Sequence, residues 1–214
     1  MPYAIHQLVS PKEEVVLEVI AALDAAFPAD EDDIGKALFG DNTTVEAMNH
    51  AVNTSQVTAG LLGGEVWVAE DDESHEILAV SVWLPPGRTM YDTDEKREKA
   101  LLPLINAMPS DAADWFDKTS HTMDEAKRRA VGDAQKTEWY LHRIGVKPGQ
   151  RGRGLGKALI AAVANKAHGR VVTLETKSDT NVRFYEKVGF EKKGSLEMDA
   201  PHGRFTIHWM AMQC

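Results

Sequence analysis

The sequence predicts an α/β fold in which helices flank a mixed sheet of seven strands. Three observations indicate it. Short alternating or apolar runs form two candidate hairpins, one near residues 65–84 and one at the carboxyl end. A strand-like segment at residues 138–146 leads through a glycine-rich loop into a segment with helical periodicity. One further strand and helix precede the last hairpin, and the chain is expected to form a single domain over residues 1–214.

The part of the chain before Pro85 is predicted to contain three strands and a helical region. A strand at residues 3–9 precedes a helix at 12–27, whose apolar residues recur on one stripe. Residues 34–62 have helical tendency, with a break near 40–42. Two strands then form a hairpin around residues 71–75, and the Pro85-Pro86-Gly87 run ends the second of them.

Residues 88–137 separate the third strand from the central one, and they are predicted to form a helical insertion of two helices. A structureless segment of this length is unusual inside a compact domain. Trp115, Met123 and Ala130 recur at helical intervals, and such stripes are usually part of the core. Pro103 should break or kink the earlier helix, because proline removes a backbone donor and clashes with the preceding turn.

A glycine-rich loop opens the helix that follows the central strand. Glycines let the backbone approach a ligand closely, and the first N–H groups of a helix have no partners within it. These groups and the positive end of the helix dipole favour an anion. The segment therefore has the features of a pyrophosphate-binding loop, made of Arg151, Gly152, Arg153, Gly154, Gly156 and Lys157.

Two other phosphate-binding motifs do not fit this loop. A Walker A loop needs glycine where the chain has Arg151, and serine or threonine where it has Ala158. A dinucleotide motif needs a third glycine where the chain has Lys157. Glu175 does lie where such a motif places its ribose-binding acid, but the loop after Val146 is too long for that tight turn.

The spacing of Arg151, Gly152, Gly154 and Gly156 resembles the acetyl-CoA loop of the GCN5-related N-acetyltransferase (GNAT) superfamily. The segment Asn181-Val182-Arg183-Phe184-Tyr185-Glu186-Lys187-Val188-Gly189-Phe190 is similar to its second signature. Within the superfamily the chain looks most like the puromycin N-acetyltransferase type. The resemblance implies a mostly antiparallel GNAT sheet whose central and following strands splay apart, and an insertion at residues 88–137 that caps the acceptor site.

The resemblance also implies a coenzyme site without a metal. Acetyl-CoA would be the cosubstrate, bound through the backbone of the central strand, the pyrophosphate loop and the helix of the second signature. The residues so implied are Ile144, Gly145, Val146, Arg151, Gly152, Arg153, Gly154, Gly156, Lys157, Asn181, Phe184 and Tyr185.

Transfer of an acetyl group to an amine needs a neutral amine and a proton donor for the departing thiolate. The resemblance makes Tyr185 the general acid. Glu138, Tyr140 and His142 alternate on one face of the central strand and are the candidates for the general base. Tyr140 and His142 fall where arylalkylamine-type members carry two histidines, and a water chain to bulk solvent is the alternative route for the proton.

The composition bounds the partners. The net charge of −9, from 33 acidic and 24 basic residues, argues against nucleic acid as the main partner. The single cysteine is Cys214, which excludes a disulfide framework. No apolar run is long enough for a membrane span, so we expect no membrane partner and a cytoplasmic location. We also expect a monomer or homodimer.

The leading hypothesis is an N-acetyltransferase that moves the acetyl group of acetyl-CoA to a primary amine of a small molecule by direct attack. Two alternatives remain open: a protein or peptide N-acetyltransferase, and a coenzyme A-binding protein without turnover. The fold alone does not decide among them.

Overall fold

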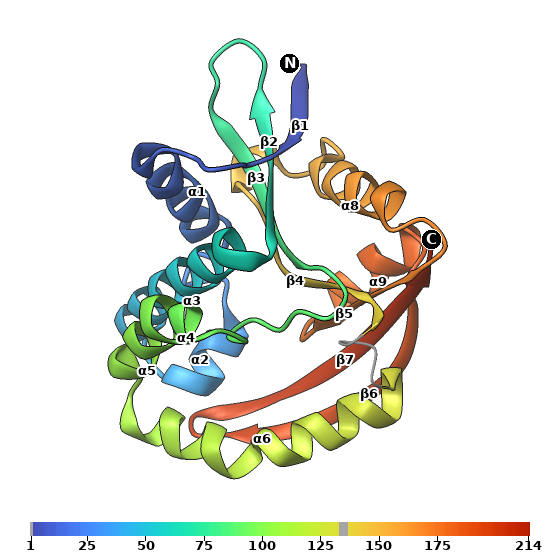
Figure 1. The fold of residues 1–214 in the computed structure, drawn as a ribbon. Helices are drawn as coiled ribbons and strands as arrows, with labels where there is room; N and C mark the ends of the chain where they lie inside the picture. Colours follow the sequence, from blue (N-terminus) through green and yellow to red (C-terminus); the bar gives the residue numbers. More distant parts are fainter. Residues whose placement is uncertain (1, 133–136) are drawn as a thin grey trace.

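A computed structural model describes residues 2–132 and 137–214 of the chain. Its centre is a sheet of seven strands in the order β1-β2-β3-β4-β5-β7-β6 (Figure 1). Among the strand pairs of the described residues, only β4 and β5 run parallel, which confirms the predicted mixed sheet. The strands are β1 Tyr3–Gln7, β2 Glu65–Asp71, β3 Ile77–Leu84, β4 Trp139–Val146, β5 Val171–Thr176, β6 Glu191–Ala200 and β7 Gly203–Gln213.

Helices cover both faces of the sheet, as predicted. On one face, α1 and α3 bury apolar residues such as Val19 and Val57 against β2 and β3. On the other face, Leu155 and Leu159 of α8 pack on β2 and β3. These helices are α1 Glu13–Ala26, α2 Asp33–Phe39, α3 Asn42–Gly63, α8 Leu155–Lys166 and α9 Asp179–Lys187.

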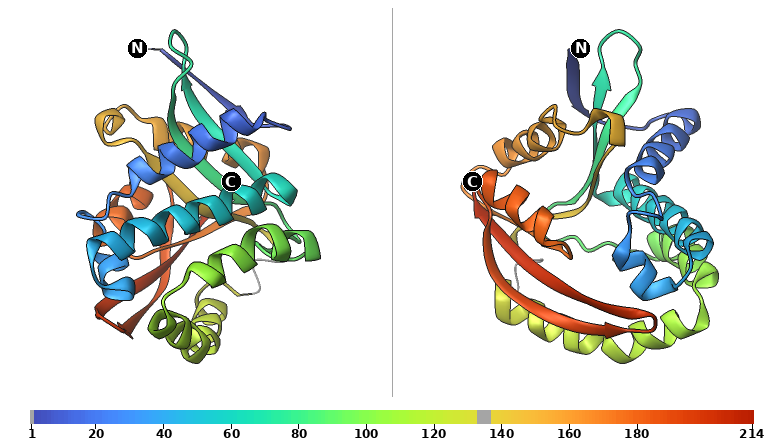
Figure 2. Two further views of the ribbon diagram at one scale, coloured as in Figure 1. Left: turned by 90° about the vertical axis from the view of Figure 1, so that its left-hand side faces the viewer. Right: turned by 180° about the vertical axis from the view of Figure 1, so that it is seen from behind.

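The insertion between β3 and β4 is helical and begins with α4, Asp94–Lys96. A π-helical turn, Arg97–Leu101, leads directly into α5, Leu102–Ala107. Pro103 lies at the start of α5, where its missing N–H costs little. The break that was predicted near this proline is the π-helical turn that precedes α5. The long helix α6, Ser110–Val131, then runs along the hairpin of β6 and β7 (Figure 2).

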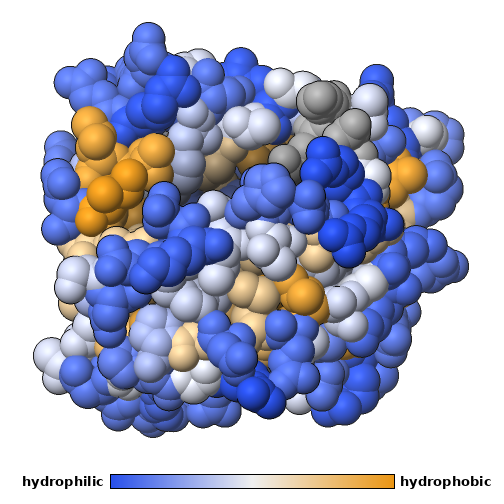
Figure 3. Space-filling view, turned by 90° about the horizontal axis from the view of Figure 1, so that it is seen from below, coloured by the Kyte–Doolittle hydropathy of each residue, from blue (hydrophilic) through white to orange (hydrophobic). Residues whose placement is uncertain are grey.

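The insertion contributes to the core of the domain. Ala100 and Ala112 are fully buried, and Met123 of α6 packs in a cluster with Phe205 and Trp209 of β7. Seen from the side of α6, the surface is mainly hydrophilic with separate hydrophobic patches (Figure 3). Leu102 and Ile105 of α5 are among the exposed large hydrophobic side chains.

The parallel pair β4 and β5 is joined over a short stretch only. Trp139, Tyr140 and Leu141 pair with Val172, Thr173 and Leu174, and no pairing continues beyond them in the described residues. Both strands extend further, β4 to Val146 and β5 to Thr176. The two strands therefore splay apart, as the resemblance implied.

Candidate active site

The point where β4 and β5 separate is marked by two titratable side chains. Leu141 of β4 and Leu174 of β5 are the last residues that pair between these two strands. His142 directly follows Leu141, and Glu175 directly follows Leu174. The two groups interact electrostatically, since each shifts the pKa of the other. The sequence identified His142 as a candidate base but gave Glu175 no part in catalysis.

A β-bulge at His142 changes the direction of the side chains along β4. Val82 of β3 pairs with Arg143 and Trp83 pairs with Leu141, so His142 is the extra residue. The ring of His142 lies 5.7 Å from the ring of Tyr140, centroid to centroid. The Arg143 guanidinium lies 3.7 Å from the ring of Phe27 at the end of α1. The bulge thus brings both side chains after Leu141 into the polar region next to Tyr140 and α1.

Burial controls the charge of His142. It lowers the pKa of this imidazole to about 4, with help from the positive charges of Lys127 and Arg143 and against the effect of Glu175. The Nδ1 atom is buried and has no hydrogen-bond partner in the described part of the chain. His142 is therefore neutral at pH 7, with a nitrogen free for a ligand or water.

Glu175 is held ionised by its neighbours. Burial raises the pKa of this carboxyl, but Lys177, Lys127, His142 and the hydrogen bond from Tyr140 together lower it further than burial raises it. The carboxylate in turn raises the pKa of the buried Tyr140 hydroxyl, after the larger effect of burial. Glu175 thus presents a negative charge at the fork of the two strands. The signal in the sequence was its place at the end of a parallel strand, where ligands bind in open α/β sheets.

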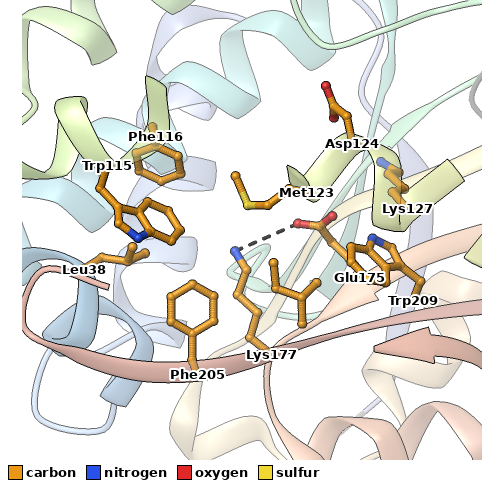
Figure 4. Close-up of a pocket in the computed structure, with 11 residues that line it drawn as sticks. Leu38, Trp115, Phe116, Met123, Asp124, Lys127, Glu175, Lys177, Phe205 and Trp209 are labelled. Atoms are coloured by element: carbon orange, nitrogen blue, oxygen red, sulfur yellow. Dashed lines mark ion pairs between the residues drawn. The ribbon is translucent and has the colours of Figure 1, made fainter. Parts of the chain in front are cut away.

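A pocket of about 210 Å³ lies between α6 and the strands β5 and β7, and Glu175 is part of its wall (Figure 4). Figure 4 shows an apolar side with Leu38, Trp115, Phe116 and Phe205, and a more polar side with Asp124, Lys127, Glu175 and Trp209. Met123, Lys177 and Ile207 complete the lining.

Lys127 links the pocket to the central strand. Its Nζ lies 4.0 Å from the centroid of the Tyr140 ring, a cation–π contact between α6 and β4. Burial lowers the pKa of Lys127, although Glu175 and Asp124 oppose the shift. The sequence gave no reason to select this residue, because it lies in the insertion, where the resemblance is weakest.

Tyr185 lies on α9 and is buried. Its ring packs edge-on against Phe184 and Phe190, and burial raises the pKa of its hydroxyl above the ordinary value. The charge of Tyr185 also contributes to the raised pKa of Tyr140, so the two hydroxyls are within electrostatic range. Tyr185 is therefore a protonated phenol next to the fork.

Glu138 lies at the other end of this region. Its Oε2 accepts a hydrogen bond of 2.7 Å from the backbone N–H of Val171, the first residue of β5. Glu175 is near the opposite end of the same strand. This hydrogen bond joins the start of β4 to the start of β5. Glu138 therefore lies apart from Glu175, although it alternates with Tyr140 and His142 along the sequence.

Two residues of the glycine-rich loop have a backbone conformation that favours glycine. Gly152 and Gly154 both have φ of +81°, which L side chains rarely adopt, and Gly154 is the residue before α8. The first N–H groups of α8, from Leu155 to Lys157, have no acceptors within the helix. A Cβ added at Gly152 or Gly154 would meet no described atom within 4 Å, so a ligand can approach the backbone there.

Three cationic side chains surround this loop. Arg151 forms an ion pair of 3.0 Å with Glu31 and donates to the carbonyl of Ala26, while Arg153 donates to Gln150. Lys157 is exposed on the first turn of α8. The loop therefore combines positive charge with unpartnered helix N–H groups.

The remaining predicted coenzyme residues lie on β4 beyond the fork and on α9. Ile144, Gly145 and Val146 pair with β3 on one edge, while their other edge faces no strand in the described residues. Gly145 also allows close packing, because a Cβ would lie 2.8 Å from the Cβ of Ala26. On α9, the ring of Phe184 lies close to Gly156 of α8, since a Cβ added at Gly156 would be 3.3 Å from it. Asn181 of the same helix is exposed.

Two other kinds of site are not found in the described residues. No group of three or more His, Cys, Asp or Glu side chains is arranged to hold a metal ion within residues 2–132 and 137–214. No helix among these residues has the length and hydropathy needed to cross a membrane.

Residues 122–192 match the family model "Acetyltransferase (GNAT) domain". Over 66 residues the chain is 36% identical to the N-alpha-acetyltransferase RimI of Mycobacterium tuberculosis and 35% identical to the uncharacterized protein ML0378 of Mycobacterium leprae. These matches cover 30% of this chain, and the chain spans 42% and 18% of the two relatives.

Solved acetyltransferase structures share the fold over the whole chain. A polyamine N-acetyltransferase of Drosophila melanogaster has a TM-score of 0.65 at 15% identity, with full coverage of both chains. Arylalkylamine N-acetyltransferase 2 of Aedes aegypti has a TM-score of 0.63 at 18% identity, covering 100% of this chain and 99% of its own. The chain has the fold of these acetyltransferases, and its match to the GNAT family model covers residues 122–192. The puromycin-type resemblance finds no counterpart among these relatives.

Proposed function

We propose that the protein is an acetyl-CoA-dependent N-acetyltransferase that moves the acetyl group to a primary amine of a small molecule. The observation that carries the proposal is the fork of β4 and β5. His142 and Glu175 lie on the two strands where they separate and interact electrostatically. The open edge of β4 leads to the glycine-rich loop, and Glu175 also lines the pocket.

In this proposal the coenzyme lies along the open edge of β4. Its pyrophosphate binds the backbone N–H groups of the loop and the start of α8, where negative charge is favoured. Arg151 leaves its ion pair with Glu31 and binds a phosphate group instead, and Arg153 and Lys157 add positive charge. Backbone groups of Ile144, Gly145 and Val146 hold the pantetheine arm and the thioester, while Asn181 and Phe184 line the groove.

The acceptor enters the pocket as an ammonium and meets the carboxylate of Glu175. Its first proton passes to neutral His142 or through water to bulk solvent. The amine nitrogen then forms a bond to the thioester carbon, and the carbon–sulfur bond breaks. Tyr185 gives its proton to the departing thiolate and regains one from the new amide nitrogen. The products are an N-acetyl amine, coenzyme A and one proton.

The structural roles of two predicted residues differ in this mechanism. The hydroxyl of Tyr140 donates a hydrogen bond to Glu175, and its ring contacts Lys127. In the proposal Tyr140 therefore orients the carboxylate of Glu175 and does not act as the general base. Glu138 bonds the backbone of β5 and has no proton-transfer role in the proposal.

In this proposal the predicted insertion caps the acceptor site; of its residues 88–137, positions 133–136 lie outside the described part of the chain. The support is that α6 supplies one wall of the pocket through Trp115, Phe116, Met123, Asp124 and Lys127. The enclosed aromatic wall favours a small acceptor over an extended peptide. A peptide acceptor is the second candidate, because a relative that matches over 66 residues is an N-alpha-acetyltransferase.

A thiol-release assay with acetyl-CoA tests the function, with mass spectrometry of the acetylated product. The acceptors are aminonucleosides, arylalkylamines, amino acids, polyamines and short peptides. Transfer to a small amine supports the proposal. Transfer to peptides alone, or coenzyme binding without transfer to any acceptor, contradicts it. Phe116→Ala should raise the KM of the acceptor, whereas Leu102→Ala on exposed α5 should not.

A further inference from the structure

The pocket holds two acidic and two basic side chains, and its charges balance. Asp124 and Glu175 contribute negative charge, while Lys127 and Lys177 contribute positive charge. A pocket built for a simple amine or a polyamine is expected to be net negative, because every added cation disfavours an ammonium ligand. The composition of this pocket therefore indicates an acceptor that carries both charges.

Lys127 provides the second observation. It forms no ion pair within 4.0 Å with any carboxylate of the described residues, and its contact is the face of the Tyr140 ring. Burial has already removed much of its water, since burial is the main cause of its lowered pKa. Lys177 lies 3.9 Å from Glu175, at the limit of an ion pair. Glu175 and Asp124 act on Lys127 only from beyond ion-pair distance, and a ligand carboxylate would give it a direct anionic partner.

Trp209 adds a neutral donor on the same side of the pocket. Its Nε1 is buried and has no hydrogen-bond partner in the described residues. Trp209 pairs with Glu175 across β5 and β7, so the donor and the carboxylate come from neighbouring positions of the sheet. An unsatisfied buried donor costs free energy, which a ligand oxygen could recover.

Asp124, Lys127 and Glu175 lie on one side of the pocket, and Lys177 lies between them and Phe205 of the apolar side (Figure 4). The charged side includes Glu175 at the fork, where the amine must react. The apolar side is formed by Leu38, Trp115, Phe116 and Phe205. A volume of about 210 Å³ suits one ring with a short head, since a cavity of about 150 Å³ holds benzene.

We propose that the acceptor is a free α-amino acid with an aromatic or large apolar side chain; this inference rests on the proposed function. The ammonium meets Glu175, the carboxylate meets Lys127 and the indole N–H of Trp209, and the side chain enters the aromatic side of the pocket. The α-nitrogen forms the bond to the acetyl carbon as the carbon–sulfur bond breaks. The products are an N-acetyl amino acid, coenzyme A and one proton.

Matched acceptors test the inference, because they differ only in the carboxylate. The kcat/KM values of L-phenylalanine and phenethylamine are compared, and likewise those of L-tryptophan and tryptamine. The amino acid should be preferred on the order of tenfold or more, the effect of one charge-assisted hydrogen bond. Lys127→Met should reduce this ratio at least about tenfold, because it removes the partner of the carboxylate. Lys118→Met, the same change at an exposed position of α6, should leave the ratio unchanged.

A binding measurement separates this inference from the proposed function. Calorimetry with coenzyme A present compares the affinities of L-phenylalanine and phenethylamine without turnover. Tighter binding of phenylalanine, lost in Lys127→Met, supports the inference even if no transfer occurs, in which case only the proposed function fails. Equal or tighter use of phenethylamine overturns the inference and leaves an amine acetyltransferase. Absence of binding by both compounds also overturns it.

Discussion

His142 and Glu175 are the first residues of β4 and β5 beyond Leu141 and Leu174, the last pair that joins the two strands. One is neutral because burial lowers the pKa of its imidazole to about 4. The other is ionised because surrounding positive charges and Tyr140 offset its burial. A neutral nitrogen and a carboxylate therefore lie on either side of the gap in which the proposed reaction takes place.

The hydroxyl of Tyr185 should matter for turnover and not for coenzyme binding. Tyr185→Phe keeps the ring that packs on Phe184 and Phe190 and removes only the proton donor. General acid catalysis contributes roughly 10²–10⁴-fold, so kcat should fall at least about tenfold. The KM for acetyl-CoA should stay within about a few-fold. Steady-state and single-turnover kinetics measure both, and an unchanged rate of the chemical step would make Tyr185 a packing residue.

Gly154 should be needed for coenzyme affinity. Its φ of +81° would cost an alanine roughly 1–2 kcal/mol, and relief of that strain would move the N–H groups of the loop. Gly154→Ala should therefore weaken acetyl-CoA binding about tenfold, measured by calorimetry. Arg153→Glu should weaken it in the same assay, because it places a negative charge next to the phosphates.

Gly149→Ala is the matched control for the loop. It lies outside the motif, and a Cβ there meets no described atom within 4 Å. Its affinity should equal that of the wild type. If Gly154→Ala and Arg153→Glu also bind with wild-type affinity, the loop does not hold the pyrophosphate.

His142 should make the stability of the protein depend on acidity. The folded-state pKa is about 4 and the unfolded value is about 6.5. Between these values the unfolded chain binds more protons, so the free energy of unfolding falls as the pH falls from about 6.5 to 4. His142→Gln removes this proton uptake and should lose less stability over the same interval. Urea unfolding at pH 7, 5.5 and 4.5 measures the difference.

The exposed His168→Gln variant controls for the loss of a histidine from the surface. Its unfolding free energy should decline with acidity in parallel with that of the wild type. If His142→Gln gives the same slope as these two proteins, the buried imidazole is protonated in the folded state as easily as in the unfolded chain.

Gly145 should be required for stability. An alanine Cβ would lie 2.8 Å from the Cβ of Ala26 and 3.0 Å from side-chain atoms of Leu23 and Phe27. Overpacking of this kind costs about 1–3 kcal/mol. The melting temperature of Gly145→Ala should fall by about 2–4 °C for each kcal/mol, measured by calorimetry. A melting temperature equal to that of Gly149→Ala would show that α1 can move away from β4 without cost.

Local patterns in the sequence determined the seven strands, the main helices and the glycine-rich loop. Side-chain alternation, helical spacing and the conformational freedom of Gly152 and Gly154 depend on residues close together in the chain. The two signature segments also carried the relation to GNAT acetyltransferases, since both lie within the matched residues 122–192. These features needed no knowledge of how distant strands pair.

The tertiary structure decided which side chains meet at the fork. Glu175 joins the site because the pairing of β4 with β5 ends one residue before it, and Lys127 joins because α6 crosses back over Tyr140. The bulge at His142 and the bond between Glu138 and Val171 depend on the register of neighbouring strands. Such contacts join residues far apart in the chain, so no periodicity in the sequence records them, and only the packed sheet and helices bring them together.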